Sequence, residues 1–260
     1  MKYKTKLKFF KIEKLKLKGI NYGFFSRLGG YSQFNFNSLN CSYNSGDRLI
    51  DVKKNINEAK KVLKLDNTNT KFLNQVHGNK VEIIDKKNLN IRIFADGAIS
   101  KNKKISLAIL TADCVPIFLI DEKNNVISAI HSGWKGCYKN VVAVAIKKIK
   151  SLNLNSKITA IVGPCLQKNN FEVQQDFKNK FIKKNKNFEI FFNKNIKTGK
   201  LFFDMPKMIN FQIQEQNINK IFNIREDTYN NTNLFFSHRR NTHLGLGNTG
   251  RMINIIGFNV

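Results

Sequence analysis

The chain of 260 residues lacks any apolar run of about 18 residues, so the sequence predicts no membrane-spanning helix. It also lacks Cys-x-x-Cys spacing: its four cysteines are typical of reduced thiols rather than of a disulfide framework. The basic N-terminal stretch has neither the uninterrupted apolar core nor the small-residue cleavage site of a secretory signal. We therefore expect a cytoplasmic protein.

Acidic residues are scarce, with 18 Asp and Glu against 45 Lys and Arg and a net charge of +27. So strong a positive charge suggests nucleic acid as a partner. The lysines are spread along the whole chain, however, and no compact motif interleaves arginine with aromatic residues. We expect no specific nucleic-acid partner, because charge alone supports only non-specific association.

No internal repeat and no linker divides the chain, which is long enough to bury a sizeable core. Hydrophobic residues make up 42%, a normal share for a globular protein. Apolar residues at helical spacing follow Asp51, predicted as an N-cap, and again follow Asp204. These patterns predict a folded protein with both helices and strands.

The stretch Thr111–Tyr138 carries the clearest chemistry. Two apolar, β-branched runs, Val115–Ile120 and Val126–Ile130, flank a polar segment and predict a β-hairpin. Cys114 stands just before the first predicted strand, and His131 just after the second. Because these positions lie at the same open end of an antiparallel hairpin, a thiol and an imidazole are expected close together.

A third candidate, His77, precedes the apolar run Val81–Ile84 and is expected at a turn between two short strands. A lone histidine there would more often be structural, but it gains weight beside Cys114 and His131. Two histidines and one cysteine are a known ligand set for a catalytic zinc with one open position. The sequence therefore predicts these three residues as metal ligands and catalytic groups.

The segments around the hairpin carry further expectations. Ala95–Ala98 reads as a turn in which Asp96 caps or orients a neighbour without being catalytic. Ser132–Gly136 reads as a loop, with Trp134 as either a pocket wall or, preferably, a core residue. Helical spacing of apolar residues then predicts a helix over Val141–Ile149.

Arginines at two places are candidates for anion binding. Arg27 precedes Gly29–Gly30, a predicted tight turn, and could hold an anion or be a surface residue. Arg239 and Arg240 follow an apolar anchor and suit phosphate or carboxylate, with a solvated basic turn as the alternative. We expect Asn241–Gly250 to be a flexible, glycine-rich loop.

The ordered motifs GFFSRLGG, NQVHG, ADGAIS, TADCVPI, AIHSGWKG, GPC, FEV and FFSHRR resemble the YfiH-like family. This family is also called the polyphenol oxidase or laccase-domain family and peptidoglycan editing factor. The similarity covers about residues 20–256. It differs where members often carry a cysteine and this chain has Asp227, and where they carry a glycine and it has Gln167. The resemblance implies one domain over residues 1–260, with an α/β fold of mixed β-sheets flanked by helices.

The resemblance also implies a zinc site on His77, Cys114 and His131, with copper as the second candidate metal. Family members are described as purine nucleoside phosphorylases that act on adenosine, inosine, guanosine or methylthioadenosine with phosphate, and as adenosine deaminases. Others remove misbuilt peptidoglycan precursors. On this basis the expected partners are small molecules, a purine nucleoside and phosphate. The expected substrate-binding residues are Gln75, Arg27, Arg239 and Arg240.

The histidine count tests the laccase label. Multicopper oxidation needs several copper ions, and imidazole is the usual copper ligand. The chain has four histidines, and two already belong to the predicted site. A trinuclear cluster and an electron-transfer copper cannot be built from the remaining two, so we expect no intrinsic laccase activity.

Two alternatives to the zinc phosphorylase use the same sequence features. In a cysteine hydrolase, Cys114 would be the nucleophile, His131 its base and His77 the orienting group. Such a hydrolase, or a zinc hydrolase at the same site, would edit peptidoglycan precursors. A non-catalytic protein that only binds purines is the alternative from another class. The sequence predicts no oligomeric state.

Overall fold

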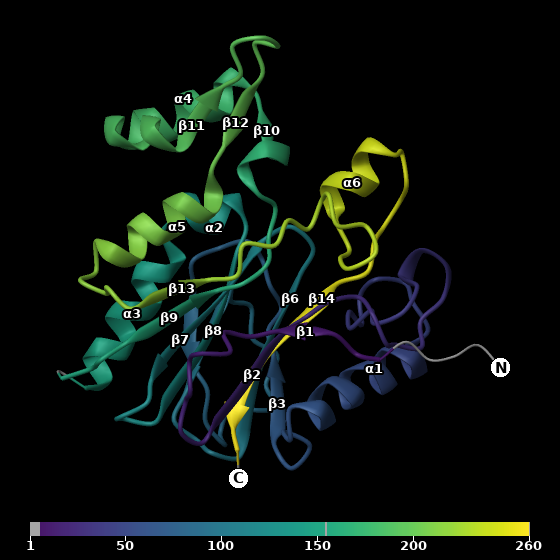
Figure 1. The fold of residues 1–260 in the computed structure, drawn as a ribbon. Coiled ribbons are helices and arrows are strands. Elements are labelled where there is room, and N and C mark those ends of the chain that lie inside the picture. The colour runs from purple at the N-terminus through teal and green to yellow at the C-terminus, as the bar shows by residue number, and fades with distance from the viewer. Residues whose placement is uncertain (1–5, 154, 260) are drawn as a thin grey trace.

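The computed structural model describes residues 6–153 and 155–259, in which two β-sheets pack face to face and helices cover their outer faces (Figure 1). The first sheet has six strands, with parallel pairing at both edges and antiparallel pairing between. Its strands in spatial order are β13 (Ile221–Asn223), β9 (Thr159–Val162), β7 (Val115–Asp121), β8 (Val126–Ser132), β5 (Gly97–Ser100) and β4 (Val81–Ile83).

The second sheet has five strands and a small third sheet has three. The five are β1 (Phe9–Phe10), β2 (Ile20–Phe25), β14 (Met252–Phe258), β6 (Ile105–Thr111) and β3 (Asn69–Phe72). The three are β10 (Glu172–Val173), β12 (Leu201–Phe203) and β11 (Phe192–Lys194). This arrangement confirms the expected α/β fold of mixed sheets flanked by helices.

The helices differ in length, and short 3₁₀ turns lie next to strands along the described chain. The α-helices are α1 (Leu49–Val62), α2 (Trp134–Tyr138), α3 (Val141–Leu152), α4 (Gln175–Lys184), α5 (Met205–Gln214) and α6 (His238–His243). The 3₁₀ turns are Phe34–Phe36, Lys168–Asn170 and Lys186–Phe191. Figure 1 shows α3 and α5 beside the six-stranded sheet, α1 beside the five-stranded sheet, and α4 with the small sheet at the top.

Strand β7 shows why the sheets stack in this way. Its residues Val115, Ile117 and Leu119 pack in the cluster that contains α3 and α5. The intervening Phe118 and Ile120 pack against the five-stranded sheet. Successive side chains of a strand point to opposite faces, and here both faces are buried, so the run is apolar without alternation. Full burial of each such side chain contributes about 1.5–3 kcal/mol.

Helix α1 covers the outer face of the five-stranded sheet. Its buried apolar face consists of Val52, Ile56 and Ala59, as its spacing predicted. The helix begins earlier than expected, with Arg48 at the N-cap position, so the prediction of Asp51 as N-cap was wrong. Asp51 lies instead in the first turn, where a negative charge favours the helix N-terminus. Asp204 does cap α5, since its side chain accepts a hydrogen bond from the Lys207 N–H.

The turn predicted at Ala95–Ala98 was wrong in its second half, because Gly97 and Ala98 belong to strand β5, which pairs with β8 on one side and β4 on the other. His77 lies, as predicted, at a turn between two short strands, β3 and β4, but these strands belong to different sheets. The loop that carries His77 therefore crosses from one sheet to the other. Local sequence did not reveal this because each strand is paired by distant segments.

The predicted loop Ser132–Gly136 also differs, since its second half forms α2. Strand β8 leads through Gly133 into α2, and Asn140 then caps α3 with a hydrogen bond from the Ala143 N–H. The predicted helix over Val141–Ile149 is confirmed as α3. The hairpin end is thereby joined to two successive helices that pack on the same sheet.

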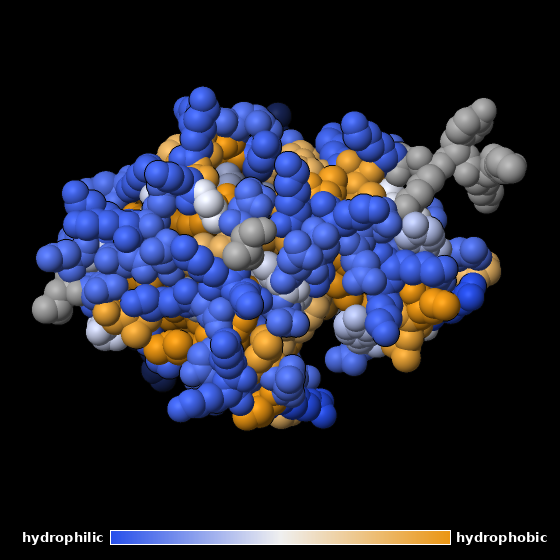
Figure 2. Space-filling model, turned by 90° about the horizontal axis from the view of Figure 1, so that it is seen from below, coloured by the Kyte–Doolittle hydropathy of each residue, from blue (hydrophilic) through white to orange (hydrophobic). Residues whose placement is uncertain are grey.

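The face at one end of the molecule is mainly polar (Figure 2). Figure 2 views the end opposite the small sheet and shows a largely hydrophilic face with separate, small hydrophobic areas. Within the described residues, no helix is both long and apolar enough to cross a membrane.

Candidate metal centre and the adjoining cavity

The hairpin brings Cys114 and His131 to one end of the sheet. In the β7–β8 register, Pro116 pairs with His131, so Cys114 lies two residues beyond that pair. His131 was predicted to follow strand β8, but it lies within that strand. The strand is longer because Ser132 still pairs with Val115. His131 is buried, with 3% of its surface exposed.

One buried carboxylate organises the two histidines. Asp96, which is fully buried, accepts hydrogen bonds at Oδ1 from His131 Nδ1 (2.8 Å) and from the His77 N–H (2.9 Å). Its Oδ2 accepts from the N–H groups of Gly78 (2.6 Å) and Val76 (3.3 Å). Burial raises the pKa of Asp96, but the His131 ring and these N–H groups outweigh it and lower the pKa overall. The sequence pointed to Asp96 only as a possible orienting group.

The backbone at His77 is held in a conformation that non-glycine residues rarely adopt. Its φ is +56°, in the left-handed region. The Asp96 carboxylate receives the three consecutive N–H groups of residues 76–78, and these bonds stabilise the turn. The strained turn is thus tied to the same group that holds His131.

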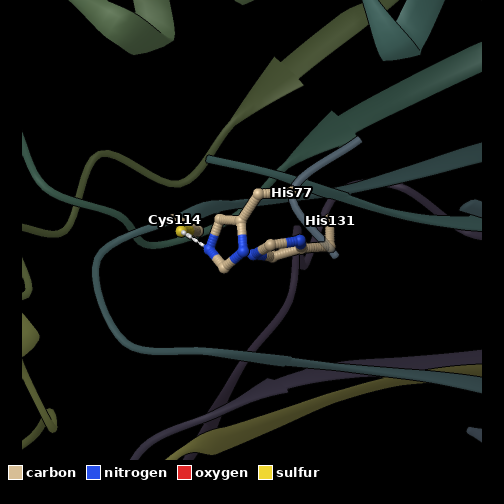
Figure 3. Close-up of side chains that lie close together, drawn as sticks. All are labelled: His77, Cys114 and His131. Carbon is tan, nitrogen blue, oxygen red and sulfur yellow. Dashed lines mark hydrogen bonds between the residues drawn. The ribbon is translucent and has the colours of Figure 1, made fainter. Parts of the chain in front are cut away.

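The three predicted ligands converge. Their donor atoms all lie within 4.8 Å of one another. Cys114 Sγ is 3.8 Å from His77 Nε2, and the His77 and His131 rings meet edge to face with centroids 4.8 Å apart. Figure 3 shows the His77 ring between the thiol and the second imidazole. Because His131 Nδ1 is bonded to Asp96, Nε2 is the nitrogen left for a metal.

A glycine leaves room for this cluster. A Cβ on Gly133 would lie 2.8 Å from His77 Cδ2 and 2.9 Å from Cys114 Sγ. Both distances are shorter than real Cβ contacts. Only glycine at this strand-to-helix junction leaves the two side chains where they are, a constraint the spacing of the motif did not disclose.

Electrostatics separates Cys114 from the other thiols. Burial raises the pKa of Cys114, but the charge of His131 and hydrogen bonds from both histidines outweigh it and bring the pKa to about 6. Burial lowers the pKa of His131, but the Cys114 thiolate and Asp96 raise it to about 9. Without metal, both shifts favour a Cys114 thiolate beside a His131 imidazolium. By contrast, burial raises the pKa of Cys41, Cys137 and Cys165.

The donor set fits one metal ion. A thiolate and two imidazoles suit zinc and leave a fourth position open, and the same donors also bind copper. Asp96 supplies the carboxylate that orients a metal-binding histidine in many such sites. Among the residues described here, this is the one group of three or more close His, Cys, Asp or Glu side chains.

A cavity of about 410 Å³ adjoins the cluster at Cys114. Trp134 lines it and is half-buried, and it also packs against the core, so it serves as a pocket wall as well as a core residue. The other lining residues are Ala112, Asp113, Gly133, Leu166, Phe171, Met205, His238, Arg239, Thr242 and His243. A larger cavity of about 840 Å³ lies at the other end of the hairpin, around Lys123 and Asn125, and includes no member of the cluster.

Of the residues predicted to bind substrate, Arg239 lines the cavity of about 410 Å³ beside Cys114. Its guanidinium lies over the Phe171 ring at 5.2 Å and donates from Nη1 to the Glu172 carbonyl at 2.9 Å. Both contacts fix the side chain at the cavity wall. They leave further N–H groups of the guanidinium for a ligand.

The other three predicted substrate-binding residues are not among the cavity lining. Gln75 donates to the Leu110 carbonyl and accepts from the Leu110 N–H, both at 2.8 Å. Arg240 donates to the carbonyls of three residues, namely Thr228, Tyr229 and Phe235. Arg27 donates to the Asn37 carbonyl and lies over the Phe236 ring. Substrate binding by these three stays a prediction.

Burial, and to a lesser degree the nearby charge of Arg240, lowers the pKa of Arg27 to about 10. The Arg27 N–H donates to the Leu234 carbonyl at 2.7 Å, and the Arg27 guanidinium lies over the Phe236 ring at 4.3 Å. These two contacts join the segment before α6 to the glycine turn that follows β2.

Sequence reasoning missed Asp113, the neighbour of Cys114. Its carboxylate accepts hydrogen bonds from Thr228 Oγ1 (2.6 Å), Ser237 Oγ (3.0 Å) and the Arg239 N–H (2.6 Å). It thus links the metal end of the hairpin to the first turn of α6. The only sequence sign was its place in the TADC motif.

His243 was also missed, because it falls in the segment predicted as a flexible loop. The structure continues α6 through His243, and its Nδ1 lies 2.9 Å from Tyr229 Oη. Both rings also meet edge to face at 5.5 Å. Two residues outside every predicted site thus form a pair at the cavity.

The fold and the clustered cysteine and histidines define a YfiH-like α/β protein. The structure of YfiH from Bacillus licheniformis, described as a hypothetical protein, matches with a TM-score of 0.82 at 25% identity and covers 92% of each chain. A Neisseria meningitidis protein matches in fold with a TM-score of 0.84 at 24% identity, covering 98% of this chain and 99% of the other.

The chain belongs to the family described as multi-copper polyphenol oxidoreductase laccase, whose model matches residues 21–259. A relative named purine nucleoside phosphorylase from Rickettsia conorii is 34% identical over 208 residues, covering 77% of this chain and 86% of that protein. One of the same name from Rickettsia prowazekii is 30% identical over 220 residues, covering 82% and 91%.

The multi-copper part of the family description does not fit this chain. The described residues hold one candidate ligand group, and the two further histidines, His238 and His243, lie outside it on α6. All four histidines of the chain are described, so only these two imidazoles remain, too few for a trinuclear copper cluster and an electron-transfer copper.

Proposed function

We propose that this protein is a metal-dependent purine nucleoside phosphorylase that acts on adenosine, inosine, guanosine or methylthioadenosine with phosphate. Adenosine deamination at the same centre is part of the proposal. Its main support is the cluster of Cys114, His77 and His131 at the edge of a cavity of about 410 Å³, a size suited to a small ligand. The names of the two Rickettsia relatives support the same reaction.

In this proposal Cys114, His77 and His131 hold zinc, with copper as the second candidate. Bound zinc supplies a Lewis acid that lowers the pKa of water to about 7 and polarises oxygen. Asp96 keeps His131 in one tautomer, with Nδ1 turned away from the ion. The substrates are small molecules, and the expected setting is the cytoplasm.

The cavity walls suit the two parts of a nucleoside reaction. Trp134 and Phe171 offer aromatic faces against which a purine can stack. Arg239 brings a guanidinium to the same space, and this group pairs well with phosphate oxygens. The substrate-binding roles of Gln75, Arg27 and Arg240 are kept as predictions.

A cysteine hydrolase that edits peptidoglycan precursors is the second candidate. The lowered pKa of Cys114, together with the neighbouring imidazolium of His131, is what a thiol nucleophile requires. This route needs no metal. Metal content and inhibition by chelators therefore separate it from the phosphorylase, whereas alkylation of the thiol does not.

The test combines metal analysis with incubation of each nucleoside and phosphate, following free base, hypoxanthine and ribose-1-phosphate. We expect about one zinc per chain and phosphate-dependent release of base. Cys114→Ala and His131→Ala should lose both metal and product. Cys41→Ala, which alters a buried thiol outside the cluster, should keep both.

Full activity in a metal-free Cys114→Ala protein would overturn the proposal. Zinc without any nucleoside product points to a zinc hydrolase of cell-wall precursors. Purine binding without product points to a binding protein. Activity on a precursor that survives complete metal removal and depends on Cys114 points to the cysteine nucleophile.

A further inference from the structure

Helix α6 forms one wall of the cavity that adjoins Cys114. Four of its residues line the cavity, namely His238, Arg239, Thr242 and His243. His238 and His243 belong neither to the cluster of candidate ligands nor to the hairpin. Because imidazole is the commonest group for proton transfer in enzymes, a cavity lined by these rings calls for a chemical role.

His243 differs from His238 in having an oriented ring. Its Nδ1 is engaged with Tyr229 Oη at 2.9 Å. No hydrogen bond to Nε2 of His243, and none to the His238 ring, exists among the described residues. His243, an exposed residue that lines the cavity, therefore keeps Nε2 without a hydrogen bond, on a ring that Tyr229 holds in place.

The pair is tied to the metal end of the hairpin. Asp113, next to Cys114, accepts hydrogen bonds from the first turn of α6 and from Thr228. Arg240, on α6, donates to the Tyr229 carbonyl at 2.7 Å. Both Tyr229 and the helix that carries His243 are thus anchored to the residue beside Cys114, and the imidazole has a defined position relative to it.

We propose that His243 is the general acid that protonates N7 of the purine leaving group, with Tyr229 as its positioning residue. This inference rests on the phosphorylase function proposed above. A phosphate oxygen forms a bond to ribose C1′, and the C1′–N9 bond breaks. The electron pair goes into the purine ring, while N7 takes the proton from Nε2 of the His243 imidazolium.

The contact with Tyr229 determines which ring nitrogen of His243 gives up its proton. As imidazolium, His243 donates from Nδ1 to Tyr229 Oη and from Nε2 to the base. After transfer it is a neutral imidazole that keeps the Nδ1–H bond, and water returns the proton before the next turnover. The acid is needed because a purine anion leaves slowly unless it is protonated as the bond breaks.

The test uses two substrates that differ in the leaving group. Inosine needs a proton on its base, whereas nitrophenyl riboside releases a stable phenolate without one. We expect His243→Gln to lower kcat for inosine about 100-fold or more and to change kcat for nitrophenyl riboside less than about threefold. Tyr229→Phe should lower kcat for inosine about tenfold, again with little effect on nitrophenyl riboside.

Each outcome decides the assignment. The assignment is supported if the His243→Gln variant keeps its zinc content and loses kcat selectively on inosine. Equal losses on both substrates, or no loss on either, overturn it. A selective loss in His238→Gln instead also overturns it, because the acid would then be the other histidine.

Failure of the proposed function gives a different result. Wild-type protein that forms no ribose-1-phosphate from either substrate overturns phosphorolysis and with it this role. Wild-type protein active on inosine, with an equally active His243→Gln variant, overturns only the role of His243.

Discussion

Two buried carboxylates hold two different walls of the same site. The metal wall is the hairpin end with the candidate ligands His77, Cys114 and His131, and the α6 wall is helix α6. Asp96 is fully buried and binds both histidines of the cluster, one through its ring and one through its backbone. Asp113 is 8% exposed and binds Thr228 and the start of α6. Each carboxylate accepts at least three hydrogen bonds, so each fixes segments that are far apart in the sequence.

The difference lies in what else supports each wall. The metal wall is part of a hairpin buried on both faces, and strand register alone brings Cys114 close to His131. The α6 wall is a helix of six residues without a buried side chain. Its place depends on Asp113 and on hydrogen bonds from Arg240. Metal binding and substrate turnover should therefore respond to different substitutions.

Asp96→Asn should have the largest effect. The amide cannot accept all four hydrogen bonds, and the His131 imidazolium of the metal-free protein would lose one of its two buried negative partners, keeping only the Cys114 thiolate. We expect the free energy of unfolding to fall by about 3 kcal/mol. Zinc affinity should fall about 10- to 100-fold. Urea unfolding of metal-free protein and competition titration with a zinc chelator measure the two effects.

Asp66→Asn is the control for this change, because Asp66 is exposed. It should leave both quantities within experimental error. An Asp96→Asn protein with wild-type stability and zinc affinity would show that the carboxylate does not organise the cluster.

Gly133→Ala should impair the metal wall from within. The added Cβ would collide with His77 and Cys114, so one ligand must move. We expect a loss of about 1–3 kcal/mol in stability, and turnover about 100-fold lower because the ligands are displaced. Gly247→Ala is matched, since a Cβ there meets nothing within 4 Å. Equal behaviour of the two variants, in zinc content and in kcat, would contradict the predicted crowding.

Asp113→Asn should separate the two walls. The amide group replaces one acceptor oxygen, so at least one bond to Thr228, Ser237 or the α6 backbone is lost. We expect about 1–2 kcal/mol of destabilisation. Zinc content should stay at the wild-type level while kcat for the nucleoside falls. Loss of zinc in parallel with turnover would show that the walls are not independent.

The smallest effect is a shift in thiol reactivity. The pKa of Cys114 is lowered to about 6, so in metal-free protein its alkylation rate should be half-maximal near pH 6 and level off above about pH 7. An ordinary thiol with a pKa of 9.0 would gain reactivity up to about pH 10. Iodoacetamide kinetics with mass spectrometry measures this profile. Cys41, whose pKa is raised by burial, serves as the internal control.

The motifs predicted well that Cys114 and His131 lie close together. Cys114 and His131 flank apolar runs that allow little but a hairpin, and the antiparallel register then brings them together. The position of His77 was less predictable. It lies on a connection between two sheets, and its left-handed backbone depends on Asp96, nineteen residues further along the chain.

The α6 wall could not be predicted in the same way. His243 lies in a stretch rich in glycine and asparagine whose composition favours a loop. Its helix forms because Ser237 caps it and Asp113, 126 positions before Arg239, accepts that residue's N–H. No local pattern reports a contact over that distance.

By itself the sequence determined the apolar hairpin and the amphipathic helices, because each depends on residues close together in the chain, and the donor chemistry of the motifs identified the three candidate ligands. Only the tertiary structure decided that Gly133 must lack a side chain, that Asp96 joins two histidines and that Asp113 brings α6 to the cavity. These features depend on sheet pairing and on hydrogen bonds between distant segments, which exist only once the two sheets have packed.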